Sequence, residues 1–115
     1  ELSSLAKDRA IVAEGAGLMP PLAGQAGIAP EHYICMVPTD SFQWEHYSKR
    51  HWVTLFLKGC TRPKTAFRRW MERDILFARR RLKEAKALGY STLVVDGSQS
   101  PEEVCDYMES VFGLT

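Results

Sequence analysis

Three short apolar runs, at residues 10–13, 33–37 and 91–95, constrain what this chain can fold into. Each run is mostly apolar rather than alternating, which is typical of a strand buried on both faces of a sheet. The segments between them are long, as the crossovers between parallel strands must be. We therefore predict an α/β fold, in a single domain or fragment spanning residues 1–115. We expect a parallel sheet of about three strands, flanked by four to five helices.

The longest helical pattern lies at residues 61–89. Its apolar side chains recur at the i, i+3, i+4 spacing of one buried face, and Gly89 can close the helix in a left-handed conformation. Residues 62–86 contain ten bases and three acids, a net charge of +7, whereas the whole chain carries only +1. The positive charge of a nearly neutral protein is therefore concentrated on one helix.

Two further helices are expected, at residues 41–58 and from Ser100 onward. Ser100 and Pro101, followed by Glu103, form the pattern of a capping box. Residues 15–30 contain four glycines and three prolines, which predicts a loop with at most one helical turn, at residues 21–25.

Composition limits the classes of function. A net charge near zero argues against binding to nucleic acid or an acidic membrane over the whole surface. Three cysteines without metal-ligand spacing indicate reduced thiols in a cytoplasmic protein. The apolar segment 10–30 is interrupted by Glu14 and Pro20, so we expect no contact with a membrane. Because the chain begins at Glu1 rather than Met, we expect a fragment or a processed product.

Polar or flexible residues follow each expected strand: Glu14 and Gly15, residues 38–40, and residues 96–98. In open parallel sheets, ligands bind at the carboxyl ends of the strands, where these segments should converge. A carboxylate at such a strand end can accept a proton or orient a water bound to Mg²⁺, which makes Glu14 a candidate catalytic and metal-site residue. The alternative is a loop glutamate that caps a helix or pairs with a lysine.

Arginines on the basic helix are the second candidate. Arg69, Arg73 and Arg80 share one face, at i, i+4 and i+11, and guanidinium groups suit phosphate oxygens. These residues could therefore form a phosphate clamp. The alternative is a solvated basic face, stabilised by ion pairs with Glu72 and Glu84 along the helix.

The turn after the third expected strand is the third candidate. Gly97, Ser98 and Gln99 lead into a helix N-terminus, whose backbone amides could face a ring or an anion. The alternative is an ordinary strand-to-helix turn that ends in the capping box and needs no ligand.

These motifs, in this order, resemble the later half of P-loop kinases, the small nucleotide and metabolite kinases, over nearly all of residues 10–113. The motifs that carry the resemblance are Glu14-Gly15, Pro38-Thr39, Arg73-Asp74, VVDGS at 94–98 and SPEEV at 100–104. The resemblance implies a three-layer α/β/α fold in which residues 41–88 form a helical lid. It also implies that Glu14 lies near Mg²⁺ and the acceptor, that Arg73, with Arg69 and Arg80, contacts the transferred phosphoryl group, and that residues 97–99 pack beside the adenine of ATP.

One motif of these kinases is missing. The chain has no G-x-x-x-x-G-K-[ST] loop, so the backbone amides and lysine that hold the β and γ phosphates are absent. We therefore expect a phosphotransferase portion that acts on a nucleotide or small metabolite, binds ATP and Mg²⁺ only when the missing half is supplied, and is inactive alone.

Two other classes of function remain open. The basic helix, residues 62–86, could bind nucleic acid through phosphate neutralisation, although Phe67 and Trp70 lie on its apolar face and not among the charges. Alternatively, the chain could be a non-catalytic interaction domain that forms a homodimer through an exposed sheet edge. Of these partners we favour a small molecule over nucleic acid.

Overall fold

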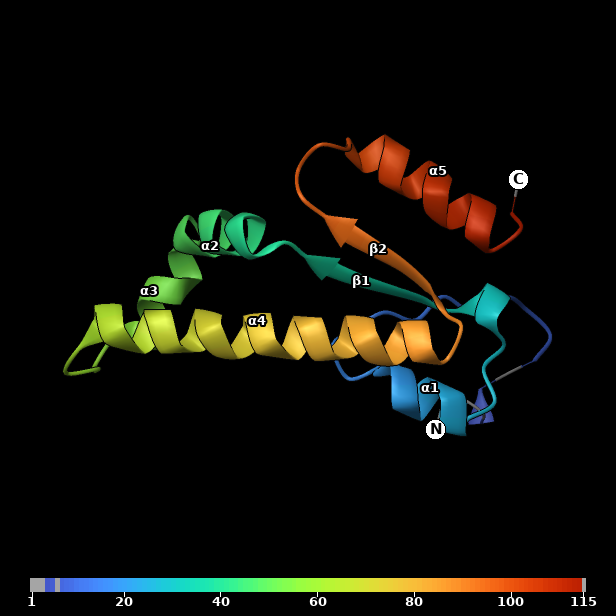
Figure 1. The fold of residues 1–115 in the computed structure, drawn as a ribbon, viewed down its shortest axis with the longest axis horizontal. Coiled ribbons are helices and arrows are strands. Elements are labelled where there is room, and N and C mark those ends of the chain that lie inside the picture. Colours follow the sequence, from blue (N-terminus) through green and yellow to red (C-terminus); the bar gives the residue numbers. More distant parts are fainter. Residues whose placement is uncertain (1–3, 6, 115) are drawn as a thin grey trace.

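The computed structural model describes residues 4–5 and 7–114 (Figure 1). Two strands, β1 (Ile34–Pro38) and β2 (Ser91–Val95), pair in parallel, with Ile34 opposite Ser91 and Pro38 opposite Val95. This pairing confirms the predicted α/β class and parallel sheet. The sheet of the described residues has two strands, however, and not about three.

The prediction of a strand at residues 10–13 is wrong. This segment has no regular secondary structure, and its side chains are open to solvent, with Ile11 49% and Val12 86% exposed. A strand needs a neighbour to satisfy its backbone N–H and C=O groups. Among the described residues β1 pairs only with β2, so no neighbour is present for residues 10–13 and their apolar character alone does not make a strand.

The remaining regular structure is helical. In chain order the helices are α1 (Pro20–Gln25), a 3₁₀ turn η2 (Pro30–His32), α2 (Asp40–Ser48), α3 (His51–Leu57), α4 (Pro63–Ala87) and α5 (Pro101–Val111). The helical turn expected at residues 21–25 corresponds to α1. The basic helix corresponds to α4, and Gly89, with a φ of +76°, closes it as expected.

The prediction of one helix at residues 41–58 is wrong, because the chain turns between α2 and α3. Arg50, which precedes α3, has an extended backbone, with φ −79° and ψ 121°. Its guanidinium lies 4.6 Å from the centre of the Tyr47 ring and 5.6 Å from that of Trp52. The turn brings Trp52 and Tyr47 against Trp70 of α4, so aromatic packing from a distant helix outweighs the local helical pattern.

Helix α4 joins two packed regions. Near its C-terminus, Ala85 is fully buried beside Cys35 and Val37 of β1, and Leu82 packs against the same core. Nearer its N-terminus, Met71 is fully buried and contacts Gln43 of α2. One helix therefore holds the sheet at one end and α2 and α3 at the other.

The overall shape is elongated. The radius of gyration is 16.6 Å, whereas about 13 Å is usual for a compact domain of this length. In Figure 1, α4 and α5 lie on opposite sides of the two strands. The Tyr107 hydroxyl donates to the Thr92 carbonyl oxygen at 3.2 Å, which attaches α5 to β2.

Candidate functional site

The carboxyl ends of β1 and β2 form one edge, and they lie in register. Pro38 is opposite Val95, and the Thr39 N–H donates to the Val95 carbonyl oxygen at 2.9 Å, so the pairing extends one residue past the strands. The segments that follow, residues 39–41 and 96–98, therefore leave the sheet side by side. This part of the sequence-based prediction is confirmed, because both segments belong to parallel neighbours.

The first segment begins α2 and carries an ion pair to α4. Thr39 caps the helix, its hydroxyl accepting from the Phe42 N–H at 3.3 Å. The carboxylate of Asp40 binds the guanidinium of Arg79, 39 residues further along the chain. Arg79 is therefore the arginine that α4 presents at this edge. Helix α4 contains nine bases, and no local sequence pattern distinguishes Arg79 from the others.

The second segment is a tight turn held by Asp96. Its carboxylate accepts from the Ser98 hydroxyl at 2.5 Å and from the Ser98 N–H at 2.8 Å, and these bonds lower the pKa of Asp96. Gly97 has a φ of +88°, and a Cβ there would lie 3.4 Å from the Phe42 ring. The positive φ thus favours glycine, and the turn packs against the Phe42 ring of α2.

The three predicted arginines lie on another face of α4. At 3.6 residues per turn, Arg69, Arg73 and Arg80 fall within about 40° of one another and roughly opposite the buried Met71 and Ala85. They point away from the sheet. Arg73 binds Asp74 at 2.7 Å and Arg80 binds Glu84 at 3.0 Å, as in the solvated basic face that we considered as the alternative.

Arg69 lines a shallow hollow of about 440 Å³ at the start of α4. The other lining residues are Gly59, Cys60, Thr61, Arg62, Thr65 and Ala66. This hollow adjoins the α3–α4 connection. Arg69 precedes Arg79 by ten residues, or about 15 Å along the helix axis.

The remaining predicted residues divide between the edge and the loop. Gly97 and Ser98 lie at the carboxyl edge, and the exposed Gln99 follows them. Glu14 lies in the exposed segment that has no strand structure, so it does not stand at a strand end as expected. Within residues 4–5 and 7–114, no three His, Cys, Asp or Glu side chains gather as a metal site would require.

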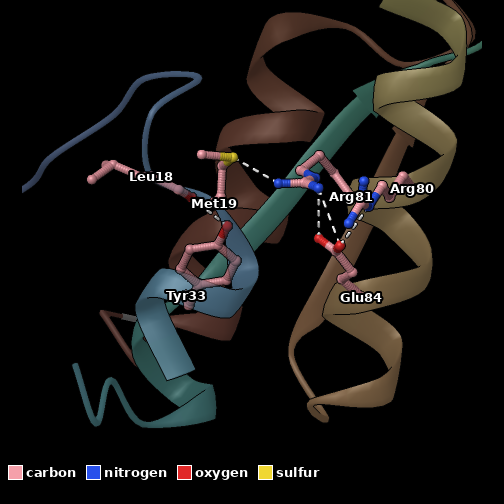
Figure 2. A network of polar contacts seen from close by, with 6 residues as sticks. All are labelled: Leu18, Met19, Tyr33, Arg80, Arg81 and Glu84. Carbon is pink, nitrogen blue, oxygen red and sulfur yellow. Dashed lines mark hydrogen bonds and ion pairs between the residues drawn. The ribbon is translucent and has the colours of Figure 1, made fainter. Parts of the chain in front are cut away.

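A partly buried polar network fixes the loop before α1 (Figure 2). The Tyr33 hydroxyl donates to the Leu18 carbonyl oxygen at 2.6 Å. The Arg81 side chain, only 12% exposed, lies between the Met19 sulfur and the Glu84 carboxylate, 3.0 Å from the latter. Burial raises the pKa of Tyr33 to about 12 and also raises the pKa of Cys35. The network is therefore structural, and Cys35 stays a neutral thiol.

Comparisons with protein-family models, curated proteins and solved structures gave no match. No family is assigned. Along the described part of the chain, no helix has the length and apolar character needed to cross a membrane. The shared sheet edge carries the guanidinium of Arg79 paired with the Asp40 carboxylate, the hydroxyls of Thr39 and Ser98, and a glycine turn held by the Asp96 carboxylate.

Proposed function

We propose that this chain forms part of an ATP-dependent phosphotransferase of the P-loop kinase type, acting on a nucleotide or small metabolite. A segment outside these 115 residues would supply the phosphate-binding loop. The observation that supports the proposal most strongly is that Thr39 and Ser98 follow the carboxyl ends of two parallel strands, with Arg79 bound to the neighbouring Asp40. Guanidinium and hydroxyl groups are donors that suit phosphate oxygens.

The free edge of β1 supports the same proposal. Among the described residues, β1 pairs with β2 on one side and with no strand on the other. A parallel strand added there would end at the same carboxyl edge, and a loop following it would lie beside Thr39.

Arg79 takes, in this proposal, the role that the sequence suggested for Arg73. Its pair with Asp40 is a surface ion pair, since the two side chains are 65% and 50% exposed. Such pairs contribute only about 0–1 kcal/mol, so phosphate oxygens can displace Asp40 at little cost. Arg69, Arg73 and Arg80 point outward and are not required for the transfer.

The donor set of the edge fits ATP, whose γ-phosphoryl group would be the one transferred. Arg79 would hold phosphate oxygens, and the turn formed by Gly97, Ser98 and Gln99 would contact the base. Glu14, in the exposed segment before α1, would hold Mg²⁺ through a water. Asp96 stays ionised because of its bonds to Ser98, and it keeps the turn in one conformation.

The test uses the natural gene product that contains these residues, with phosphoryl transfer and Mg-ATP binding as readouts. Arg79→Ala should lower kcat about 100-fold or more, as losing one charge-stabilising donor does. Arg73→Ala is the matched control on the same helix. It should change kcat by less than about fivefold, the equivalent of a surface ion pair of ~1 kcal/mol.

Two results would contradict the proposal. One is a gene product that has no phosphate-binding loop and does not bind Mg-ATP. The other is transfer activity in residues 1–115 alone, since these contain no such loop. If Arg73→Ala inactivated the enzyme and Arg79→Ala did not, the kinase reading would stand, but the assignment of Arg79 would be wrong.

A further inference from the structure

Helix α4 presents a stripe of cations to solvent. Arg69, Arg73, Leu76, Arg80 and Lys83 follow one another at helical spacings of four, three, four and three residues, within an arc of about 80°. We call these five residues the basic stripe. All are exposed, and Leu76, at its centre, is 64% exposed. Although Arg73 and Arg80 have acidic neighbours, their side chains remain 73% and 75% exposed, so both can meet another partner.

Helix α5 presents the opposite charge. Glu102, Asp106 and Glu109 lie within an arc of about 60° and form what we call the acidic stripe. All three are exposed, and across the described residues none of them forms an ion pair. Residues 88–115 contain five acids and no base, so this part of the chain contributes no positive charge to the stripe.

The two stripes match in length as well as in charge. Glu102 and Glu109 are seven residues apart, as are Arg73 and Arg80, and both separations are about 10.5 Å along a helix axis. Leu76 lies between the two arginines, and Asp106 lies between the two glutamates. Two such helices laid side by side would set charge against charge at both ends.

We propose that the acidic stripe of one molecule docks on the basic stripe of a second copy of this chain. In Figure 1, α4 and α5 lie on opposite sides of the strands, so one molecule cannot join its own stripes. The contact is heterologous, and it adds molecules head to tail. It differs from the sheet-edge homodimer expected from the sequence, and it does not depend on the kinase proposal.

A second copy fits better than nucleic acid. The basic stripe alone would suit a polyanion, but the same molecule carries an acidic helix, and its net charge is only +1. A polyanion bound to the basic stripe would leave the acidic stripe, on the other side of the strands, unneutralised. Self-association neutralises both stripes with one contact.

Sedimentation velocity over a dilution series of residues 1–115 tests the proposal. The weight-average mass should rise above the 13.0 kDa of the monomer as concentration increases. Raising the salt from about 0.1 M to about 1 M shortens the Debye length from about 10 Å to about 3 Å, and it should weaken the association at least about tenfold.

Charge reversal identifies the surfaces. One variant carries Glu102→Lys, Asp106→Lys and Glu109→Lys, and the other carries Arg73→Glu, Arg80→Glu and Lys83→Glu. Each should be monomeric alone, because both of its stripes then have the same sign. An equimolar mixture should associate again, because each helix finds an opposite charge on the other variant. This rescue also shows that both variants are folded.

The control variant carries Asp8→Lys, Glu31→Lys and Glu45→Lys, which changes the net charge as much as the α5 variant does but touches neither stripe. It should associate like the unmodified chain. A chain that is monomeric at all concentrations would overturn the proposal, as would a mixture of the reversed variants that stays monomeric. A monomer that instead binds an RNA oligonucleotide through α4 would overturn it in favour of a nucleic-acid partner.

Discussion

Tyr33 lies in an environment that its place in an apolar run does not predict. It was read from the sequence as the first position of an apolar strand, but it precedes β1 and its hydroxyl donates to the Leu18 carbonyl oxygen. Its ring lies 4.6 Å from that of Tyr90, centre to centre. Tyr33 therefore attaches the loop before α1 to the sheet core. Its hydrogen bond joins positions 15 residues apart, and no local sequence pattern predicts that pairing.

Tyr33→Phe should make stability less dependent on alkaline pH. The fold holds the neutral phenol, so the stabilisation it gives is complete below pH 10.0 and is lost as pH rises towards the folded-state pKa of about 12. At pH 7, losing the hydrogen bond should cost about 1 kcal/mol. Urea unfolding at a series of pH values from neutral to alkaline measures both effects.

Tyr107→Phe serves as the control, because Tyr107 also donates to a carbonyl oxygen but belongs to α5. If Tyr33→Phe lost stability in alkaline solution as steeply as the unmodified chain, ionisation of Tyr33 would not be the cause.

At the scale of single elements, α5 is the helix that local sequence specifies most completely. None of its residues is buried, yet it begins at Pro101 as expected. The Ser100 hydroxyl accepts from the Glu103 N–H at 3.2 Å, and the Glu103 carboxylate accepts from the Ser100 N–H at 2.7 Å. The signals that start this helix are all within four residues, so they can be recognised in the sequence.

Ser100→Ala should therefore destabilise the protein by about 1 kcal/mol, the usual effect of losing an N-cap. Ser110→Ala, at an exposed position of the same helix, should stay within about 0.5 kcal/mol. Chemical denaturation followed by circular dichroism compares the two. Equal effects would mean that the capping box does not stabilise α5 in solution.

Helices α2 and α3 are the opposite case. Nothing between residues 41 and 58 marks a break, because neither Gly nor Pro interrupts the pattern there. The turn at Arg50 depends on Trp70, which arrives from α4. Local periodicity does not predict a contact with a residue so far along the chain.

For the molecule as a whole, the consequence of one long helix with two packed regions is uneven stability. Cys35, Val37 and Ala85 hold the sheet end, whereas Met71 and Val53 are buried at the other end. Because α4 is the connection between the two packed regions, a mutation can unfold one region while the other stays folded.

Met71→Ala should lower the free energy of unfolding by about 2–5 kcal/mol, because a fully buried side chain is replaced by a cavity. Hydrogen exchange should show lost protection in α2 and α3, with protection in β1 retained. Leu76→Ala, an exposed leucine on the same helix, should change stability by less than about 0.5 kcal/mol. A uniform loss of protection would mean that the two regions unfold as one.

The sequence by itself determined the elements whose signals are local: strands β1 and β2, the span and charge of α4, the start of α5, and the parallel order that follows from long crossovers. Tertiary structure alone decided the rest. Residues 10–13 are apolar enough for a strand but have no neighbour to bond with. Arg79 and not Arg73 reaches the carboxyl edge, because Asp40, 39 residues away, lies on that side of α4. Strand neighbours and side-chain direction depend on where distant segments pack, and composition and periodicity do not encode that.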